Sequence, residues 1–480
     1  MKISTIINII GKLLIYLSLI LLTPIFVALT DHNQSLVPFV LTFIITMLVG
    51  CVCVLTTKKV REITIKEGFL VVTLTWVAYA FFGALPYLFD GVFTSLTDAF
   101  FEAMSGFTTT GSTVMTNIEG ASKAILYWRS LTQFLGGMGI IVLGIAILPE
   151  ITTGTMELFK AEVPGPTKDR LFPKIKDTAK TLWLVYVILT VAEIILLKFG
   201  GISLYESVCH AFTTMATGGF STRNLSIVGF NSAYIEWVMV FFMFMAGVNF
   251  TLHYHLLRGR IKPYFKSSEF RVYLGIFVLG TIFVSINIFS HIGTGILDTV
   301  RYASFQVISI LTTTGYASHD FELWPAFSQV LLFLFMFLGA MAGSTGGGMK
   351  VVRIQLIIKQ GFLQIKKLIH PQMVGHVKLG NRVVPYRILN VVSGFILLYL
   401  SSFVIGILIV SAFGIDFVTS FSSVAACLGN IGPGFGTVGA MDNFAHLPMV
   451  VKNVLSFLML LGRLELYTVI VILSPAFWRD

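Results

Sequence analysis

The sequence predicts an all-α integral membrane protein that consists of an N-terminal hairpin of two transmembrane helices followed by four similar units. Three observations predict this class: an apolar composition, ten apolar stretches, and a short glycine-containing motif that occurs four times. Of the 480 residues, 56% are hydrophobic and only 12% are charged, and the mean hydropathy is +0.87. Such a chain cannot cover its apolar surface in water, so we expect it to lie in a lipid bilayer.

The ten apolar stretches approach or exceed the roughly 18 residues that a helix needs to cross the hydrocarbon core of a bilayer. They span residues 13–30, 36–56, 69–89, 124–148, 182–197, 234–257, 273–289, 326–342, 388–413 and 449–473. We expect the first stretch to be a retained helix rather than a cleaved leader, because the apolar run is long and no small-residue cleavage site follows it.

The basic residues predict how these helices are oriented. The chain has 33 Lys and Arg against 23 Asp and Glu, a net charge of +10. Most of the basic residues lie near the termini or after the second, fourth, sixth and eighth stretches. By the positive-inside rule these segments and both termini are cytoplasmic. Topology and anionic membrane lipid therefore explain the charge, and we expect no nucleic-acid partner.

The glycine-containing motif lies on the predicted outer side, between stretches three and four, five and six, seven and eight, and nine and ten. In each case about a dozen moderately apolar residues, too few to cross a bilayer, precede Gly, Thr or Ser residues. The four segments read FFEAMSGFTTTGSTVM, SVCHAFTTMATGGFST, SFQVISILTTTGYASH and SSVAACLGNIGPGFGT. Aligned without gaps, they place in common columns Thr109, Thr110 and Gly111; Ala216, Thr217 and Gly218; Thr313, Thr314 and Gly315; and Asn430, Ile431 and Gly432.

The motif divides the chain into a hairpin and four copies of one unit, made of a span, a short helix, a glycine loop and a second span. The predicted boundaries are 1–66 for the hairpin and 67–165, 166–262, 263–375 and 376–480 for the units. Repeats of this size predict that each copy forms one wall of a shared structure. Non-helical backbone at membrane depth is tolerated only where protein or water covers it, which a central pore provides. Four such loops can aim carbonyl oxygens at a dehydrated alkali cation, and the short helices can point their negative C-terminal ends toward it.

Two further features lie on the cytoplasmic side of the predicted pore. The eighth stretch runs into Gly343, Ser344, Thr345, Gly346, Gly347 and Gly348. Because glycine in a helix interior costs about 1 kcal/mol relative to alanine, we expect the helix to be interrupted there. The segment either lines the ion path as a broken helix or is an ordinary cytoplasmic turn. Arg463 lies midway along the tenth stretch, where arginine costs at least about 2.5 kcal/mol unless it reaches water or a partner.

These motifs, and the arrangement of the whole chain, resemble the Trk/Ktr/HKT superfamily of potassium transporters. The resemblance implies K⁺ uptake through one pore per chain, with K⁺ bound in a filter whose glycines match Gly111, Gly218, Gly315 and Gly432. Members with serine at the first position tend to favour Na⁺, so four glycines imply K⁺. The resemblance also implies that residues 343–348 form an intramembrane gating loop and that Arg463 projects into the pore below the filter.

The same resemblance implies a location in the bacterial plasma (inner) membrane, a homodimer, and a cytoplasmic TrkA-type nucleotide-binding regulatory subunit. We expect this subunit to dock on the basic loops, including Lys174 and Lys176. The chain itself has no Walker or dinucleotide-binding motif, so no organic cofactor is expected. An enzyme is disfavoured because the scarce intramembrane charges do not cluster as acid, base or metal ligands. A symporter that moves K⁺ with H⁺ or Na⁺ through the same pore stays open.

The remaining polar residues are expected to have structural roles. Glu102 and Glu206 lie in the short helices at different alignment columns, and the cysteines and histidines lack metal-ligand spacing. We place Arg129 and Arg223 near the outer surface and Lys452 at the membrane interface.

Overall fold

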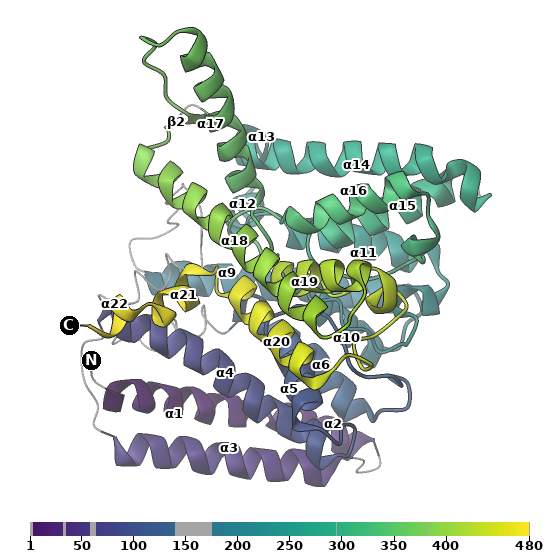
Figure 1. The fold of residues 1–480 in the computed structure, drawn as a ribbon. Helices are drawn as coiled ribbons and strands as arrows, with labels where there is room; N and C mark the ends of the chain where they lie inside the picture. Colours follow the sequence, from purple (N-terminus) through teal and green to yellow (C-terminus); the bar gives the residue numbers. More distant parts are fainter. Residues whose placement is uncertain are drawn as a thin grey trace.

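The computed structural model describes residues 3–31, 35–57, 64–139, 175–293, 295–380 and 382–479. Within these residues the chain is mostly helical, and its one sheet is a two-stranded hairpin. The long helices run side by side along one direction of the molecule. The first helix, α1 (Ile3–Ile20), begins on the side where the last, α22 (Pro475–Trp478), ends (Figure 1).

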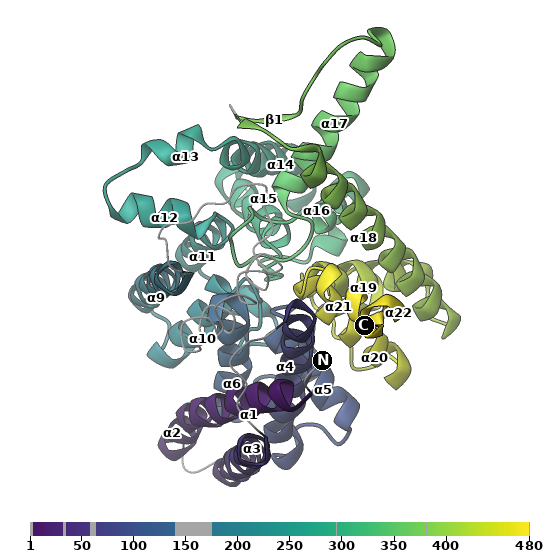
Figure 2. The same ribbon diagram turned by 90° about the vertical axis from the view of Figure 1, so that its left-hand side faces the viewer.

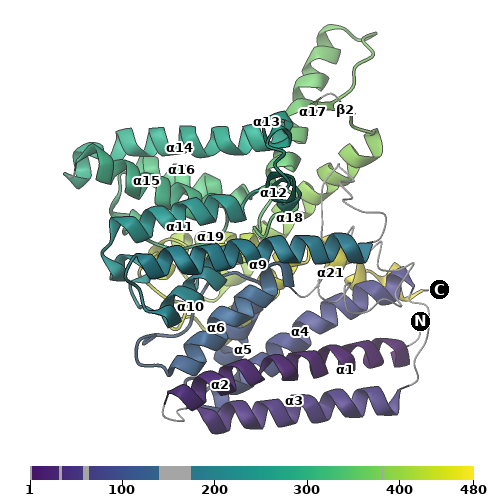
Figure 3. The same cartoon turned by 180° about the vertical axis from the view of Figure 1, so that it is seen from behind.

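The N-terminal hairpin forms as predicted and lies at one edge of the molecule (Figure 3). Helix α1 continues into α2 (Leu22–Thr30) and packs along α3 (Leu36–Thr56). The two long helices approach closely at Gly11 and Gly50, where a Cβ atom on either residue would lie 2.9 Å from the carbonyl oxygen of the other. Small residues thus hold this helix pair together, as is common in membranes.

The rest of the described chain contains four groups of helices, arranged around the middle of the molecule (Figure 2). Each group has a long outer helix, a short helix and an inner helix. The outer helices are α4 (Ile65–Phe89), α9 (Ile175–Phe199), α14 (Ser268–Ile292) and α18 (Tyr386–Ala412). The short helices are α5 (Leu96–Phe107), α10 (Leu204–Met215), α15 (Ile296–Leu311) and α19 (Phe417–Gly429).

The inner helices begin at α6 (Lys123–Phe134), α11 (Ala233–Ala246), α16 (Ala326–Phe337) and α20 (Met449–Arg463). Shorter elements continue or connect them: the π-helical segment η1 (Leu135–Gly139), α12 (Phe250–Leu257), α13 (Lys262–Lys266), α17 (Val351–Ile369), α21 (Tyr467–Leu473), the 3₁₀ turns η2 (Ser226–Phe230), η3 (Phe321–Leu323) and η4 (Gly436–Val438), and the strands β1 (Lys378–Leu379) and β2 (Arg382–Val383).

Six helical segments are long and apolar enough to cross a membrane. They are Ile3–Thr30, Leu36–Thr56, Lys66–Phe89, Ala179–Phe199, Ser268–Ile292 and Tyr386–Ala412. Polar caps fix where several helices begin; for example, the Thr64 hydroxyl accepts a hydrogen bond from the Glu67 backbone N–H at 3.3 Å, while Glu67 accepts one from the Thr64 N–H. These segments match six of the ten predicted spans.

The four inner spans are not the continuous helices that hydropathy predicts. The prediction was wrong at 234–257, where α11 and α12 bend by 104°, and at 449–473, where α20 and α21 bend by 118°. The break predicted in the eighth span is present, since no helix covers residues 338–350. In the fourth span, α6 changes to a π-helical segment at Leu135, and residues 140–148 lie outside the described chain.

The cytoplasmic side predicted from charge corresponds to one face of the molecule. Helices α12, α13 and α17 and both chain ends lie toward this face, and α17 projects beyond the helix bundle (Figures 1 and 2). The basic segment that contains Lys174 lies outside the described residues, as does the side chain of Lys176. The predicted unit boundaries and the orientation in the membrane stay predictions.

Candidate functional site

The four short helices converge on one central region and end in the same backbone pattern. Three of them start at a side-chain cap that accepts a backbone N–H: Ser95 for α5, Ser203 for α10 and Asp416 for α19. Just beyond each C-terminus, one N–H donates at 2.8 Å to a carbonyl five residues earlier. The four bonds are Thr110 to Ser105, Gly218 to Thr213, Thr314 to Ser309 and Ile431 to Ala426.

The residues on either side of these donors have left-handed backbone. The preceding residues are not glycine: Thr109, Thr217, Thr313 and Asn430 have φ of 52°, 55°, 60° and 53°. The following residues are all glycine: Gly111, Gly219, Gly315 and Gly432 have φ of 88°, 76°, 80° and 110°. Non-glycine residues rarely adopt positive φ, and such residues are often found at functional sites. The same strained turn therefore occurs four times.

These four glycines form a closed ring, which we call the glycine ring. A Cβ atom on Gly111 would collide with the carbonyl oxygen of Gly218 in the next loop. In the same way, Gly219 lies against the Thr314 carbonyl and Gly315 against the Ile431 carbonyl. The ring closes where a Cβ atom on Gly432 would lie 3.0 Å from the Thr110 carbonyl oxygen.

The second loop does not follow the gapless alignment. That alignment groups Gly218 with Gly111, Gly315 and Gly432, whereas the backbone places Gly219 with them and Gly218 with Thr110. Ala216 is accordingly the C-cap of α10 rather than the partner of Thr109. The sequence Thr-Gly-Gly permits either register, and only the conformation separates them.

Polar side chains fix the loops around the ring. The hydroxyls of Thr108 and Thr110 lie 2.7 Å apart, and those of Thr312 and Thr314 lie 2.8 Å apart. Asn430 joins the fourth loop to the first, because its Nδ2 donates to Thr110 Oγ1 at 2.9 Å. Nδ2 also donates to the Met459 carbonyl of α20 at 2.9 Å. The loops are thus held by each other and by an inner helix.

The segment between α16 and α17 lies directly against the ring loops. The Gly347 N–H donates to Thr313 Oγ1 at 2.7 Å, and Thr345 Oγ1 donates to the Met215 carbonyl at the end of α10 at 2.9 Å. A Cβ atom on Gly346 would lie 2.9 Å from the Thr312 carbonyl oxygen, and one on Gly347 would lie 2.6 Å from that of Gly429. Glycine at these two positions therefore allows close contact with two short-helix ends.

Arg463 connects three of the four inner segments at this level. Its guanidinium donates to the Thr345 carbonyl at 2.9 Å and to the Gly137 carbonyl at 2.8 Å, and also to the Gly136 carbonyl. The arginine ends α20, while Gly136 and Gly137 lie in η1. Lys350 contributes a second positive group, which is buried and whose ammonium donates to the Gly346 carbonyl. Positive charge is therefore concentrated on one side of the ring.

Comparison with known proteins identifies the family. The TrkH family model, described as a cation transport protein, matches residues 35–479. The chain is 42% identical to the Trk system potassium uptake protein TrkH of Escherichia coli K12, with 100% of both chains covered. It also matches the crystal structure of the potassium transporter TrkH from Vibrio parahaemolyticus, with a TM-score of 0.90, 39% identity and 100% of both chains covered.

The chain belongs to the TrkH family. It is 38% identical to a second relative from Escherichia coli K12, the Trk system potassium uptake protein TrkG, over 98% of this chain and 97% of the relative. The fold and the relatives are those of a membrane transporter of the Trk system and not of an enzyme. Among the described residues, no three His, Cys, Asp or Glu side chains are grouped as a metal site.

Sequence reasoning predicted the break in the third inner span of this TrkH-family chain but missed the bends in the second and fourth and the π-helical segment in the first. A glycine at each break packs against the end of a short helix, and any Cβ atom would crowd it: Gly136 meets the Phe107 carbonyl and Gly462 the Leu428 carbonyl. Gly247 does the same beside Thr312, and Gly347 beside Gly429. The signal was available as one or more glycines near the middle of each inner span.

Charged residues on or near the short helices form ion pairs, two of them with a buried basic partner. Arg129 lies 2.8 Å from Glu102, with side chains 1% and 0% exposed, so its charge is paired inside the protein; its depth near the outer surface stays a prediction. Lys452 is buried and pairs with Asp98 at 2.6 Å, and its position at the membrane interface stays a prediction. Arg223, in contrast, is partly exposed and pairs with Glu206 at 2.9 Å.

Glu322 connects the outer parts of the third and fourth groups. Its Oε1 accepts the Gly436 N–H at 2.5 Å. Removal from water raises the pKa of the Glu322 carboxyl above its ordinary value. The hydrogen bond from Gly436 lowers this pKa, and the nearby negative charges of Asp320 and Asp442 raise it further.

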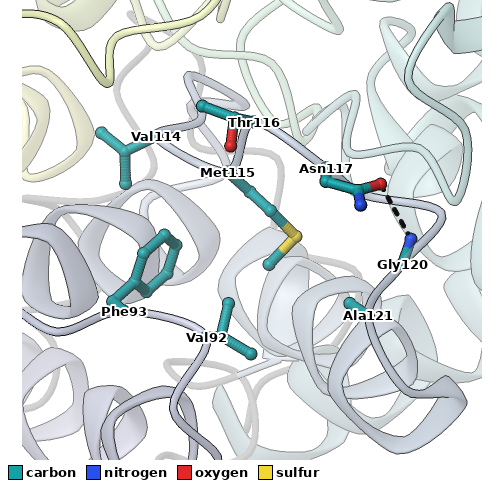
Figure 4. Close-up of a pocket in the computed structure, with 8 residues that line it drawn as sticks. All are labelled: Val92, Phe93, Val114, Met115, Thr116, Asn117, Gly120 and Ala121. Atoms are coloured by element: carbon teal, nitrogen blue, oxygen red, sulfur yellow. Dashed lines mark hydrogen bonds between the residues drawn. The ribbon is translucent and has the colours of Figure 1, made fainter.

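One cavity of about 240 Å³ lies beside the first loop (Figure 4). Its lining residues are Val92, Phe93, Val114, Met115, Thr116, Asn117, Gly120 and Ala121. None of them belongs to the glycine ring or to the segment between α16 and α17, and none is charged. The cavity is therefore separate from the site built by the four loops.

Proposed function

We propose that this chain is a pore for K⁺ uptake, with the glycine ring as its selectivity filter. The observation that carries the proposal is the closure of four loops into one ring through contacts between each glycine and a carbonyl group of the next loop. Glycine lets the backbones approach closely enough for carbonyl oxygens to replace the hydration shell of an alkali cation. K⁺ is the expected ion because four glycines occupy the ring and because the relatives are named potassium uptake proteins.

The filter residues in this proposal are those predicted from the sequence, with one extension. They are Thr109, Thr110, Gly111, Ala216, Thr217, Gly218, Thr313, Thr314, Gly315, Asn430, Ile431 and Gly432, to which the ring geometry adds Gly219. The C-terminal ends of the four short helices lie next to these residues. Their partial negative charges favour a cation over an anion.

The gate in this proposal is the segment Gly343–Gly348 together with Arg463. The segment contacts three short-helix ends, and the arginine bonds it to η1. A positive charge beside a narrow path opposes cation flow, so movement of the segment and the arginine would open the path. The hydrogen bond from Gly347 to Thr313 connects this gate directly to the filter.

We place the protein in the bacterial plasma membrane with both termini in the cytoplasm. A homodimer and a TrkA-type cytoplasmic regulatory subunit complete the proposed system. Support comes from α17, which projects from the bundle and exposes the apolar side chains of Phe362 and Leu368 near Lys366. An exposed apolar surface next to basic groups is suited to a protein partner on this side.

Ion selectivity tests the filter proposal. Gly111→Ser or Gly315→Ser introduces a side chain where a Cβ atom would collide with a carbonyl of the neighbouring loop, so K⁺ preference over Na⁺ should fall. Gly275→Ser is the matched control, because no atom lies within 4 Å of a Cβ atom at Gly275. Unchanged K⁺ and Na⁺ fluxes in vesicles that contain either ring variant would refute the assignment.

A further inference from the structure

Gln133 is a buried amide on the inner helix α6 that bonds to the backbone of the second ring loop. Helix α6 packs against α10, the short helix that leads into this loop (Figure 3). The Gln133 side chain is fully buried, and its Nε2 donates to the Gly218 carbonyl at 2.7 Å. Its Oε1 accepts the Phe220 N–H at 3.0 Å. The amide thus bonds to the residues immediately before and after Gly219, which belongs to the glycine ring.

The second ring loop lacks a hydroxyl pair that is present in two other loops. In the first and third loops, two threonine hydroxyls that are two positions apart bond to each other. The helix ends place Ala216 and Gly218 at the corresponding positions of the second loop, and neither residue has a hydroxyl. Gln133 therefore supplies from α6 the polar contacts that the second loop does not make by itself.

The space around Gly218 explains why this residue is glycine although it lies outside the ring. Its φ is not positive, so its backbone conformation does not require glycine. A Cβ atom at this position would collide with the amide group of Gln133. Glycine at position 218 therefore makes room for the amide that bonds to the loop.

The same contacts oppose the other register that the sequence Thr-Gly-Gly permits. If Gly218 were the ring glycine, Thr217 would take the place of Gly218, and its side chain would enter the space that the Gln133 amide fills. Arg129 lies one turn earlier on the same face of α6, and its Nη1 donates to the Ser221 carbonyl at 3.0 Å. One face of α6 therefore bonds to the second loop at three places.

We propose that Gln133 is a positioning residue that fixes the register of the second ring loop and so makes Gly219, not Gly218, the ring glycine. This inference deepens the proposed filter function and rests on it. Gln133 acts on cation selection through the loop backbone, because it bonds to the same Gly218 carbonyl that lies against Gly111 of the first loop.

A stability measurement tests the contact independently of transport. Gly218→Ala places a Cβ atom against the amide of Gln133, and Gln133→Ala removes that amide. The fall in Tm caused by Gly218→Ala should therefore be smaller in the Gln133→Ala background than in wild type. Gly315→Ala is the matched control, because its Cβ atom would meet the Ile431 carbonyl, and its effect on Tm should be equal in both backgrounds. An equal effect of Gly218→Ala in both backgrounds would overturn the proposal.

Selectivity measurements test the positioning role. Gln133→Leu removes both the donor and the acceptor, and it should lower the preference for K⁺ over Na⁺ by at least about 2-fold, the lower limit for one lost hydrogen bond. Gln329→Leu is the matched control on the inner helix α16, because the Gln329 amide donates to the carbonyls of Glu322 and Trp324 outside the ring. The control should keep the wild-type preference.

The conservative variant Gln133→Glu tests the hydrogen bonds themselves. At acid pH, where its carboxyl is protonated, the new side chain keeps one donor and one acceptor. Its K⁺ preference should therefore exceed that of Gln133→Leu at the same pH. A Gln133→Glu protein that is no more selective than Gln133→Leu under these conditions would overturn the proposal.

These outcomes separate the inference from the filter proposal. Wild-type K⁺ preference in Gln133→Leu would refute the positioning role. If Gln133→Leu does not fold, Gln133→Asn, whose amide is one methylene group shorter, decides the question by the same measurement. A wild-type protein without K⁺ preference would refute the filter proposal, while the coupling between Gly218→Ala and Gln133→Ala in Tm would still report on the register.

Discussion

Two independent constraints favour glycine at each position of the glycine ring: a positive φ and the close approach of the neighbouring loop. Positive φ costs a non-glycine residue roughly 1–2 kcal/mol, and the neighbouring loop leaves no room for a Cβ atom. Thr109, Thr217, Thr313 and Asn430 share the positive φ but are not glycine, so strain alone is tolerated. Close approach of the loops is therefore what excludes side chains from the ring.

The second loop offers a direct test, because it has two adjacent glycines. A Cβ atom on Gly219 would collide with the Thr314 carbonyl at positive φ, whereas one on Gly218 would meet the amide end of the Gln133 side chain, which is not backbone but is hydrogen-bonded to Gly218 and Phe220. We expect Gly219→Ala to lower K⁺ preference by about tenfold or more, the effect of at least 1.4 kcal/mol, and Gly218→Ala to lower it less. Flux ratios in vesicles measure this, and a larger loss in Gly218→Ala would favour the gapless alignment.

Glu322 should make the stability of the outer loops depend on pH. Burial raises its folded-state pKa, so the folded protein holds this proton more tightly than the unfolded chain. The resulting stability is fully present below the ordinary Glu pKa of about 4.3 and is lost as pH rises through the folded-state pKa. In thermal unfolding in detergent, we therefore expect wild type to lose stability relative to Glu322→Gln as pH rises from about 4. Parallel pH profiles of the two proteins would contradict this.

The inner helices combine two tasks that one continuous helix cannot perform. Their outer halves pack against the short helices, and their interrupted middles bring backbone and glycine up to the short-helix ends. The segment 338–350 is the longest of these interruptions within the described chain, and Arg463 ties it to η1. Arg463 of α20 thus bonds both to the segment 338–350 and to η1. Movement of any one of these three parts therefore changes the contacts of the other two.

The proposed gate leads to a prediction about flux. Deleting Gly343–Gly348, or making Arg463→Ala, should raise K⁺ flux in vesicles that lack the regulator by about tenfold, as expected when roughly 1.4 kcal/mol of barrier is lost. The combined variant should give less than the product of the two effects, because both changes act on one obstacle. Wild-type flux in both single variants, with folding verified by gel filtration, would mean that the barrier lies elsewhere.

The sequence was sufficient for the long helices and insufficient for the breaks. Span length and apolar composition predicted α3, α4, α9, α14 and α18, because lipid-facing helices must be continuously apolar. The bends after Ala246 and Arg463 escaped prediction because the two helices at each bend are together apolar enough to be taken for one span. The ion pairs of Arg129 and Lys452 were not predicted because their partners, Glu102 and Asp98, are distant in sequence, and pairing across the fold does not show in a local pattern.

At the scale of the whole molecule, basic residues on one face are expected to contact the regulatory subunit. Charge reversal at Lys174 and Lys176 should weaken capture of the purified regulator from detergent, since buried or rim charges of the wrong sign oppose association. Charge reversal at Lys198, at the opposite end of α9, is the control and should have no effect. Equal capture by wild type and the Lys174/Lys176 variant would remove these residues from the interface.

The ring also accounts for the architecture of the molecule. Each group of helices contributes one loop, and each loop contacts the next, so the proposed pore requires all four groups. The asymmetries are equally informative: Asn430 bonds the fourth loop to the first, and the long interruption occurs only in the third group among the described residues. A ring of four similar loops can thus have a gate on one side.

The reversal potential of the reconstituted protein tests the central claim most directly. With high K⁺ and low Na⁺ on one side of the bilayer and the two concentrations exchanged on the other, a K⁺-selective ring predicts a reversal potential close to the equilibrium potential for K⁺. An added proton or Na⁺ gradient should leave that value unchanged for a pore and shift it for a symporter. Under these opposite and matched gradients, a reversal potential near zero, or one close to the Na⁺ equilibrium potential, would contradict the account.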